Sequence, residues 1–426
     1  MEIISAKYML PMTNGCPVIE DNAIATDLDR IVDIGSKEDL VKRYPTAELK
    51  EYPGSVLMPG LVNAHCHLDL VNFSCIDNEE FEPATPPEDP IENLIATILY
   101  KQDAKPDRVY VGMQRGAMRL IETGVTCIGD VTHFEGTFRL LDEVGLRAVV
   151  FPEVLAGIGP QTKDRFEVAL ALIDKYMSAS HTRIQLGIGP YSPYTLSRQL
   201  LKIISQHARE ASIPIQIHAA ETFAEMEFFF DSQGPIATEL FPALGWKELP
   251  PEQRKTPIQY LSDIGFLDAP VTIVGALHLS KGDCPLLARN LTQVIYCPSN
   301  NEYLKLGTLP YGNLVKAGIP IGIGTEQWRG RLGFNLWEEL RIASKRGSNP
   351  IPTAQELVRM ATIGGARTLG LSHNIGTIEN GKKADFIVIT PSKKFSKGRL
   401  YEDLIETTQP QHIVLVVVNG KILKRK

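Results

Sequence analysis

The sequence has no cluster of Lys and Arg residues and no long apolar segment. Its 426 residues carry 44 Lys and Arg against 50 Asp and Glu, a formal net charge of -6 at pH 7, which argues against nucleic acid or an anionic membrane as a partner. The start lacks the charged and apolar regions of a signal peptide. The longest apolar runs, such as HIVLVVV at 412–418, are too short to span a bilayer. We therefore expect a cytoplasmic protein that binds neither nucleic acid nor membrane.

Cysteine frameworks and nucleotide-binding motifs are also missing. The six cysteines, at positions 16, 66, 75, 127, 284 and 297, form neither a C-x-x-C pair nor a regular pattern, and we predict that they are reduced thiols. Three glycine-rich turns, GIGPQT, GIGPYS and GIGTEQ, lack the last glycine of the dinucleotide-binding pattern. The segment GTIENGKK has Lys383 where a P-loop needs a hydroxyl. An open doubly wound nucleotide-binding sheet is thus disfavoured.

Eight β-rich apolar runs alternate with segments of helical periodicity. Hydrophobic residues make up 43% and charged residues 22% of the chain, as in ordinary globular proteins. Near-continuous apolar strands separated by helices are typical of a parallel α/β protein, and eight of them suggest a (β/α)8 TIM barrel. We predict this barrel over residues 55–374. The eight runs cover residues 55–65, 125–133, 146–154, 183–191, 213–221, 271–279, 291–299 and 319–326.

The two ends of the chain have a different pattern. Residues 1–54 and 375–426 alternate in strand fashion with short turns such as ENGK and NGK, and neither end is long enough to bury a core alone. We predict that they combine into one small β-sandwich domain beside the barrel. Two long connections, 79–93 and 228–257, follow the first and fifth strands, and we expect them to cover a site.

Two histidines one residue apart lie where the first barrel strand ends. In the stretch MPGLVNAHCHLDL, the side chains of His65 and His67 project from the same face of an extended strand, with Cα atoms about 6.6 Å apart. Both rings can therefore reach one ion. His133 ends the second predicted strand, where it would face the same mouth of the barrel.

Further nitrogen and oxygen donors follow the fifth, sixth and eighth strands. His218, His278 and Glu326 stand at these positions, and the carboxyl ends of barrel strands meet at one face. Imidazole and carboxylate donors suit one divalent transition metal, zinc first and iron(II) second. The alternatives are that the histidines are satisfied core residues and that Glu326 pairs with Arg329 or Arg331.

These residues resemble the amidohydrolase superfamily, specifically its mononuclear-metal deaminase and chlorohydrolase branch. The likeness covers nearly the whole chain, and the motifs together are highly specific. They are PGLVNAHCH, GPYSPYT in place of GPHAPYT, HAAET, CPSNN, IGTE in place of GTD, NLWEELR and IGTIENGKKADFIVI.

The resemblance implies a role for each matching residue. Glu221 would act as the proton shuttle, His278 would orient the attacking water, and Glu326 would be the carboxylate of strand eight. The implied metal ligands are His65, His67, His218 and Glu326. The implied substrate-binding residues are His133, Glu153, Tyr191 and Asn301.

Three positions depart from the pattern of the branch. Glu326 stands where Asp is usual, so its carboxylate is displaced by about 1.5 Å unless the backbone or rotamer compensates. Tyr191 replaces a histidine that contacts substrate, and Asn300 replaces a serine. A degenerate homologue that binds without catalysis is therefore an alternative.

Within the branch, several details resemble the 6-aminodeoxyfutalosine deaminases of menaquinone biosynthesis. These are HCHLDL, GLRAVVFPEV, ETFAEMEFF and the insertion around TPIQYL. The resemblance implies hydrolytic removal of the exocyclic amino group of an aminopurine-type nucleoside. Adenosine, methylthioadenosine or adenosylhomocysteine deamination and triazine dechlorination are the alternative activities. The partner would be a small heterocyclic substrate, and a homodimer is left open.

Overall fold

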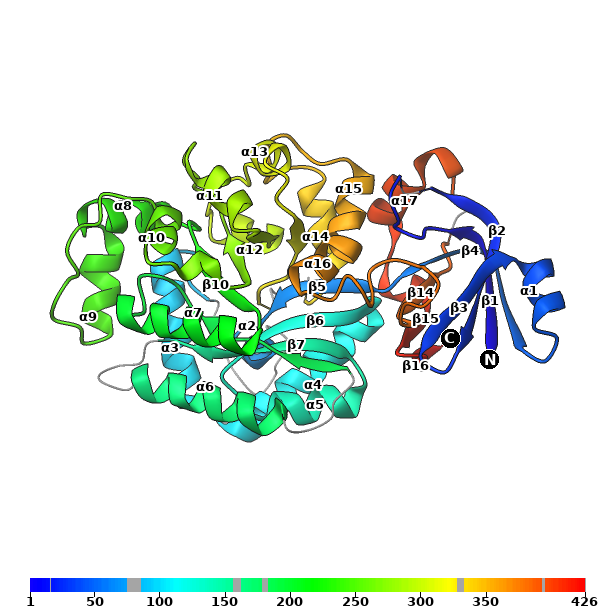
Figure 1. Cartoon of the computed structure of the whole chain (residues 1–426), viewed down its shortest axis with the longest axis horizontal. Helices are drawn as coiled ribbons and strands as arrows, with labels where there is room; N and C mark the ends of the chain where they lie inside the picture. Colours follow the sequence, from blue (N-terminus) through cyan, green and yellow to red (C-terminus); the bar gives the residue numbers. More distant parts are fainter. Residues whose placement is uncertain are drawn as a thin grey trace.

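A computed structural model gives the fold of the chain. It describes residues 1–15, 17–74, 86–155, 162–177, 183–327, 333–392 and 395–425. Cys16, Cys75 and part of the predicted connection 79–93 lie outside the described residues. The other four cysteines are free thiols, as predicted. Figure 1 shows a larger part with helices around parallel strands, and a smaller sheet at one end that contains both chain termini.

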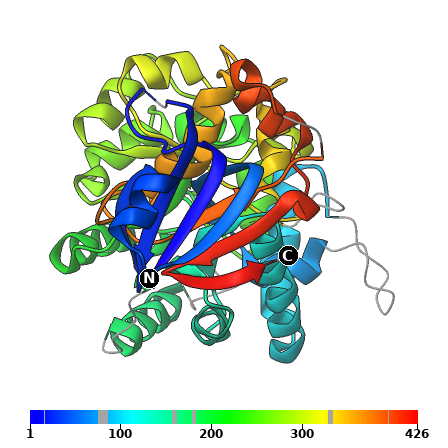
Figure 2. The same cartoon turned by 90° about the vertical axis from the view of Figure 1, so that its right-hand side faces the viewer.

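Strands from both ends of the chain form the smaller sheet. They are β1 (Glu2–Met9), β2 (Ile19–Asp27), β3 (Arg30–Ser36), β4 (Glu48–Pro59), β14 (Phe386–Ile389), β15 (Ile413–Val418) and β16 (Lys421–Arg425). The order is β16-β15-β14-β4-β1-β2-β3, with β1 and β4 parallel and the other pairs antiparallel. Figure 2 shows the strands of the two ends side by side. We expected a β-sandwich, but one continuous sheet of seven strands forms, because β4 pairs with strands from both ends.

The apolar run predicted as the first barrel strand contains two strands. β4 ends at Pro59 in the small sheet, and β5 (Leu61–Cys66) begins the parallel sheet after Gly60. A Cβ at Gly60 would lie 2.0 Å from the Thr126 hydroxyl oxygen, so only glycine fits this crossing. The chain passes through a single residue from one sheet to the other.

The remaining strands form two parallel sheets. They are β6 (Val125–Thr132), β7 (Arg147–Val154), β8 (Ile184–Leu186), β9 (Gly189–Pro190), β10 (Ile215–Ala219), β11 (Val271–Gly275), β12 (Gln293–Tyr296) and β13 (Ile321–Ile323). One sheet has the order β5-β6-β7-β8, with β9 beside β7, and the other has the order β10-β11-β12-β13. Each strand lies within a predicted run. Two isolated parallel bridges, Ile188–Ile215 and Cys66–Glu326, connect the edges of the two sheets.

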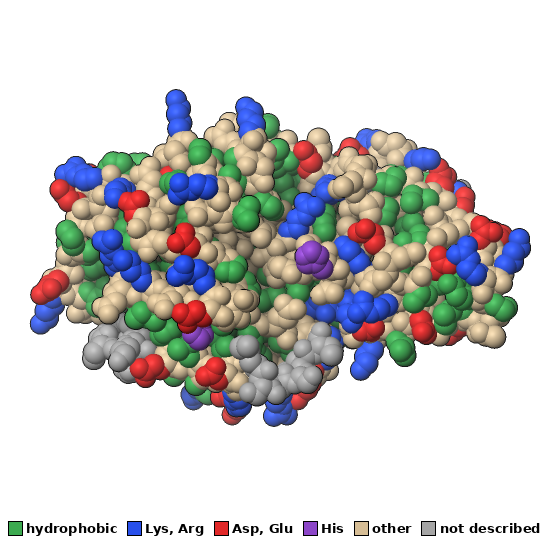
Figure 3. All heavy atoms as spheres, in the orientation of Figure 1, with side chains coloured by type: hydrophobic (Ala, Val, Ile, Leu, Met, Phe, Trp, Pro, Cys, Tyr) green, Lys and Arg blue, Asp and Glu red, His purple; other side chains and the backbone are tan. Residues whose placement is uncertain are grey.

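Helices between the strands cover these sheets. In the helix Pro106–Glu122, Val109, Met113, Ala117 and Leu120 are buried at helical spacing and pack on the apolar core. No helix among the described residues is both long and apolar enough to cross a membrane. On the face shown in Figure 3, acidic and basic side chains are interspersed.

The helices have the following bounds: α1 (Lys37–Arg43), α2 (Val71–Ser74), α3 (Pro90–Asp103), α4 (Pro106–Glu122), α5 (Gly136–Val144), α6 (Thr162–Met177), α7 (Arg198–Ala211), α8 (Phe223–Asp231), α9 (Phe241–Ala243), α10 (Pro257–Asp263), α11 (Asp283–Arg289), α12 (Pro298–Tyr303), α13 (Tyr311–Lys316), α14 (Leu336–Ala343), α15 (Ala354–Arg359), α16 (Gly365–Thr368) and α17 (Leu400–Thr407).

A buried ion pair joins the small sheet to the parallel strands. Arg147 at the start of β7 donates from Nε and an Nη to the two carboxylate oxygens of Asp385, at 2.7 and 3.0 Å. The Asp385 carboxylate also accepts from the backbone of Asn419 at 2.8 Å. The side chains of the ion pair are 4% and 1% exposed, so each charge depends on the other for compensation.

We predict that Asp385→Asn lowers the free energy of unfolding by about 3 kcal/mol, because it leaves a buried guanidinium without a counter-charge. Urea denaturation followed by circular dichroism measures this. Asp21→Asn is the matched control, since that carboxylate is 74% exposed in its pair with Lys7 and should have little effect. Equal effects of the two substitutions would contradict the prediction.

Candidate metal centre

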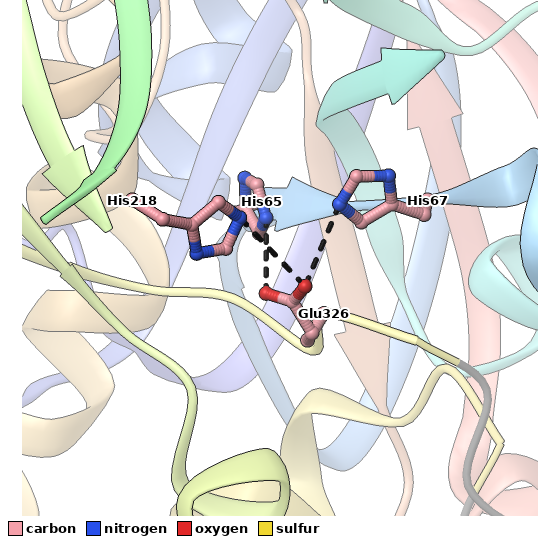
Figure 4. Close-up of side chains that lie close together, drawn as sticks. All are labelled: His65, His67, His218 and Glu326. Atoms are coloured by element: carbon pink, nitrogen blue, oxygen red, sulfur yellow. Dashed lines mark ion pairs between the residues drawn. The ribbon is translucent and has the colours of Figure 1, made fainter. Parts of the chain in front are cut away.

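Three histidines and one glutamate meet at the ends of the parallel strands. One nitrogen or oxygen atom from each of His65, His67, His218 and Glu326 lies within 4.8 Å of the others, and all four residues are buried. The Nε2 atoms of His65, His67 and His218 lie 3.0, 3.5 and 3.8 Å from the Glu326 carboxylate. Figure 4 shows the three rings directed at that carboxylate. The structure therefore brings together all four predicted metal ligands.

The ring of His65 is held in one tautomer by an amide. Its Nδ1 lies 2.8 Å from Gln216 Oε1, and Gln216 Nε2 donates to the Ala64 carbonyl at 2.9 Å. Because the amide nitrogen is used by the carbonyl, its oxygen accepts a proton from Nδ1, and Nε2 keeps its lone pair. Sequence reasoning missed Gln216, although it lies on β10 two residues before His218.

The backbone around Glu326 is fixed to β5. Thr325 exchanges two hydrogen bonds with the Asn63 side chain, at 2.8 and 3.1 Å. The Glu326 amide donates to the His65 carbonyl at 3.2 Å, and the His67 amide donates to the Glu326 carbonyl at 2.8 Å. Asn63 was also missed; it precedes His65 by two residues and so shares its face of the strand.

Residues after three strand ends have left-handed backbone. Ala220, Ala276 and Glu326 have φ values of 52°, 52° and 58°, a conformation that is uncommon outside glycine and concentrated at functional sites. Despite its additional methylene, the Glu326 side chain places its carboxylate within 3.8 Å of all three imidazoles. Glutamate in place of aspartate at position 326 therefore still allows the four metal donors to meet.

The donor atoms fit a divalent cation. Apart from their contacts with one another, Nε2 of His65, Nε2 of His218 and Oε2 of Glu326 have no hydrogen-bond partner among the described residues, and all three are buried. Buried polar atoms without partners are costly in a folded protein. Three imidazoles and one carboxylate are a donor set that suits zinc or a similar divalent metal.

Burial and neighbouring charges compete in setting the pKa values of the group. Burial lowers the pKa of His65 and exceeds the opposing effect of Glu326. Burial also acts to lower the pKa of His218, but the carboxylates of Glu221 and Glu326 outweigh it and raise this pKa to about 9. Burial would raise the pKa of Glu326, yet His65 and His218 hold it well below its usual range. A cation at these atoms would meet an ionised carboxylate.

Glu221 contacts the ring of His218 at Nδ1, the nitrogen that does not face Glu326. Its Oε2 lies 3.0 Å from His218 Nδ1, and its side chain is 13% exposed. The amide of Glu221 donates to the Glu225 carboxylate at 2.9 Å, and burial raises the pKa of Glu225 to about 8. A Cβ at Gly275 would lie 2.7 Å from Cβ of Glu221, so glycine is required there. Sequence reasoning missed both Glu225 and Gly275.

Of two other predicted residues, Tyr191 borders the four metal donors and the side chain of His278 does not contact them. The ring of Tyr191 lies 5.1 Å from that of His218, and burial raises the pKa of the tyrosine well above its usual value. His278 is half-buried, and its Nε2 lies 2.7 Å from the Leu306 carbonyl. The described contacts of His278 are thus with Leu306 and with the ring of Phe223, not with the four metal donors.

Asn301 is buried without a hydrogen-bond partner for its amide. The side chain follows β12 and is 3% exposed, and neither Nδ2 nor Oδ1 has a partner among the described residues. An amide in this state offers one donor group and one acceptor to a bound molecule.

Glu153 and His133 belong to a second group of buried charges. Lys101 Nζ donates to Glu153 Oε2 at 2.5 Å and lies 4.0 Å from Asp69 Oδ2, which is 2.6 Å from His133 Nδ1. Burial acts to lower the pKa of Lys101, but the carboxylates of Asp69 and Glu153 outweigh it and raise this pKa. Burial acts to raise the pKa of Glu153, but Lys101 outweighs it and lowers this pKa. Lys101 lies on α3, and its distance from the strands along the chain gave no signal in the sequence.

The connection 228–257 lines a cavity of about 1170 Å³. None of the described residues that line this cavity is one of the four metal donors. We expected the connection to cover the site, but this cavity lies elsewhere. Its apolar walls include Tyr194, Phe228, Phe229, Phe241, Trp246 and Leu249.

The fold and the donor group define an α/β protein with a buried site for one divalent cation and a small sheet built from both chain ends. The model of the amidohydrolase family matches residues 56–423. The chain belongs to the amidohydrolase family, and the resemblance drawn from its motifs is confirmed. It is accordingly a hydrolase of carbon–nitrogen bonds other than peptide bonds.

Relatives with assigned names lie in the predicted branch. The 5-methylthioadenosine/S-adenosylhomocysteine deaminase of Thermodesulfovibrio yellowstonii is 28% identical over 434 residues, covering 98% of this chain and 92% of the relative. The aminofutalosine deaminase of Helicobacter pylori, in complex with methylthio-coformycin, has a TM-score of 0.84 at 22% identity, covering 99% and 100% of the two chains.

A chlorohydrolase has the same fold. The zinc complex of the atrazine chlorohydrolase from Arthrobacter aurescens has a TM-score of 0.82 at 20% identity, covering 100% of this chain and 95% of the other. At this level of identity the two structural likenesses establish the fold and not the substrate.

We predict that Gln216→Leu weakens metal binding about 10- to 100-fold, because His65 loses the acceptor that fixes its tautomer. Metal content after dialysis against a graded chelator series measures the change. Gln206→Leu is the control, since that amide pairs with Glu210 on the exposed side of α7. Unchanged affinity in Gln216→Leu would contradict the assigned tautomer.

We further predict that Glu326→Asp weakens metal binding at least about tenfold, since the carboxylate retracts by about 1.5 Å from the three imidazoles. The same chelator series applies, with the exposed Glu143→Asp as the matched control. Tighter binding by the aspartate variant would show that the native glutamate is a handicap to the site.

Proposed function

We propose that this protein is a metal-dependent hydrolytic deaminase that removes the exocyclic amino group of an aminopurine-type nucleoside. The observation that carries the proposal is the pairing of the Glu221 carboxylate with Nδ1 of His218 at 3.0 Å, because His218 is also one of the four grouped metal donors. We assign to this carboxyl group the exchange of protons with a molecule bound at the cation. The name of the Thermodesulfovibrio relative is consistent with such a substrate.

The proposed cofactor is one divalent cation, zinc first and iron(II) second, held by His65, His67, His218 and Glu326. The structure of the Arthrobacter chlorohydrolase is a complex with zinc, which supports zinc as the first choice. When bound, such a cation acidifies a water molecule and so supplies a nucleophile at neutral pH.

Proton transfer is assigned to Glu221. Its carboxyl group gives a proton to a ring nitrogen of the substrate, which makes the carbon that bears the amino group electrophilic. After water has added to that carbon, Glu221 relays one proton of the water to the amine, which leaves as ammonia, and keeps the other proton, which restores its acid form. Glu225 and Gly275 position this side chain through the amide hydrogen bond and the close packing described above. His278 follows β11 along the chain, and we propose that it orients the attacking water.

The remaining predicted residues are proposed to hold the substrate. The unpartnered amide of Asn301 offers a donor and an acceptor to a polar heterocycle. Tyr191 contributes an aromatic face beside His218. Glu153 and His133 complete the proposed pocket. As the particular substrate we propose 6-aminodeoxyfutalosine, which would place the enzyme in menaquinone biosynthesis; a sequence likeness and the fold of the Helicobacter enzyme support this choice.

We also infer that the two parallel sheets close into one (β/α)8 barrel over residues 55–374, with residues 1–54 and 375–426 as the composite second domain. The bridges Ile188–Ile215 and Cys66–Glu326 support closure at the two seams. Closure would explain why donors from both sheets meet at one point.

Ammonia release from a panel of substrates tests the proposed activity. The panel comprises 6-aminodeoxyfutalosine, adenosine, methylthioadenosine, adenosylhomocysteine, guanine and a chlorinated triazine, each with the metal-loaded enzyme. We expect the first to have the highest kcat/KM. Chloride release from the triazine without ammonia release from any nucleoside would replace the deaminase assignment, and the absence of all turnover with stoichiometric metal would favour a degenerate binding protein.

We predict that Glu221→Gln lowers kcat at least about a thousandfold while the metal content stays at one per chain, because the amide cannot transfer a proton. Steady-state ammonia release and metal analysis measure the two effects. Glu227→Gln, on the helix α8 that follows Glu221, is the control. Loss of metal from Glu221→Gln would contradict the assigned role as proton shuttle.

A further inference from the structure

A buried carboxylate from α14 holds the first turn of α12. Glu339 is 1% exposed. Its Oε2 accepts a hydrogen bond from the Ser299 amide at 2.8 Å, and its Oε1 accepts one from the Ser299 hydroxyl. Within the described part of the chain, the side chain of Cys297, which precedes α12, gives the helix no capping hydrogen bond. Glu339 therefore supplies, from a distant part of the sequence, an acceptor that the first turn of α12 lacks.

The helix that carries Glu339 is itself fixed to the parallel strands and their helices. The Asn335 side chain accepts a hydrogen bond from the Trp337 amide at 3.1 Å. The buried indole of Trp337 donates to the carbonyl of Thr123, the residue after α4, at 3.0 Å. The Glu339 carboxylate thus acts on α12 from a rigid support.

The backbone of Asn301 connects α12 to the turn at Leu306. The Asn301 amide donates to the Cys297 carbonyl at 3.0 Å, and the Asn301 carbonyl accepts from the Leu306 amide at 2.9 Å. The side-chain amide of Asn301 is buried and has no hydrogen-bond partner among the described residues. The main chain of Asn301 is therefore held on both sides while its side chain stays available to a ligand.

The turn at Leu306 in turn holds the ring of His278. Nε2 of His278 lies 2.7 Å from the Leu306 carbonyl oxygen. Because a carbonyl oxygen can only accept, Nε2 carries the proton and Nδ1 keeps its lone pair. A Cβ at Gly307 would lie 3.4 Å from Nε2 of His278, so the backbone of this turn packs directly against the ring.

We infer that Glu339 is a positioning residue that sets Asn301 and His278 together, through Ser299 and the turn at Leu306. The inference rests on the proposed function for the roles of Asn301 and His278. In the arrangement described, Nδ1 of His278 is the ring nitrogen that accepts a hydrogen bond from the attacking water. Glu339 acts through Ser299 and does not itself touch the substrate. None of these contacts involves one of the four metal donors, so metal binding should not depend on them.

Steady-state ammonia release by Glu339→Gln tests the inference in the metal-loaded enzyme, with the panel substrate that has the highest kcat/KM. Glutamine offers one acceptor oxygen where the carboxylate offers two, so one donor of Ser299 loses its partner. We expect KM to rise at least about fivefold through Asn301 and kcat to fall at least about tenfold through His278, with one metal per chain retained. Unchanged KM and kcat would overturn the inference.

Glu338→Gln is the matched control. This neighbour on α14 pairs with Arg341, and its substitution should leave KM and kcat unchanged. A merely structural role of Glu339 would reduce the folded fraction of Glu339→Gln, so kcat per chain and metal content would fall together at an unchanged KM. That pattern, with circular dichroism showing partial unfolding, would count against the inference.

Nitrogen NMR of the zinc-loaded enzyme with isotope-labelled histidine reports on His278 without any turnover. The signal of His278 is the one lost in His278→Gln. In the wild type and in Glu338→Gln, we expect the chemical shifts of a ring protonated at Nε2. In Glu339→Gln, the shifts of the two ring nitrogens should move toward each other, because the weakened turn lets the two tautomers mix.

This signal keeps the two proposals distinguishable. If no nucleoside is deaminated but the His278 signal changes in Glu339→Gln and not in Glu338→Gln, the proposed function fails and the positioning by Glu339 holds. If the signal stays as in the wild type, the inference fails whatever the activity.

Ser299→Ala decides the question if Glu339→Gln does not fold. It removes the hydroxyl and keeps the amide hydrogen bond, and we expect KM to rise at least about twofold. An unchanged KM together with an unchanged His278 signal in this variant would overturn the inference.

Discussion

The structure depends on the burial of the Glu326 carboxylate among three imidazoles. An ionised carboxylate can be buried only if positive or hydrogen-bonded partners surround it, and these partners come from β5 and β10, far apart in the sequence. The two hydrogen bonds between Asn63 and Thr325 hold the end of β13 against β5. The strand ends must therefore meet before the charge can be compensated, which couples the folding of the parallel sheets to the assembly of the site.

A second group of buried charges, around Lys101, is compensated in the same way. The four metal donors, and the group of Lys101, Asp69, Glu153 and His133, each place a buried carboxylate next to a cationic or cation-binding side chain. Removing one member leaves its partner buried and uncompensated, which costs more than the pair itself contributes. Both groups of buried charges thus combine side chains from different elements of the fold.

The sequence was sufficient for the strands and for the donors at their ends. Continuous apolar runs mark buried parallel strands, and parallel strands end at one edge, so His65, His67, His218 and Glu326 could be placed together without coordinates. Gly60 could not be placed, because the apolar run on both sides conceals the change of sheet. Lys101 and Gln216 were missed for another reason: their partners are distant in the chain, and no local periodicity records such a pairing. The contact of His278 with the Leu306 carbonyl depends on a side-chain orientation that no pattern encodes.

The left-handed residues after β10, β11 and β13 limit how this enzyme can be diversified. Branched side chains at Ala220 or Ala276 would strain the backbone that presents Glu221 and His278, so a mutational library aimed at new substrates loses folded members there. Variation is better directed at Tyr191 and Asn301, whose backbones are outside that region. Substitutions that broaden the substrate range are therefore expected at these two side chains rather than at the three left-handed positions.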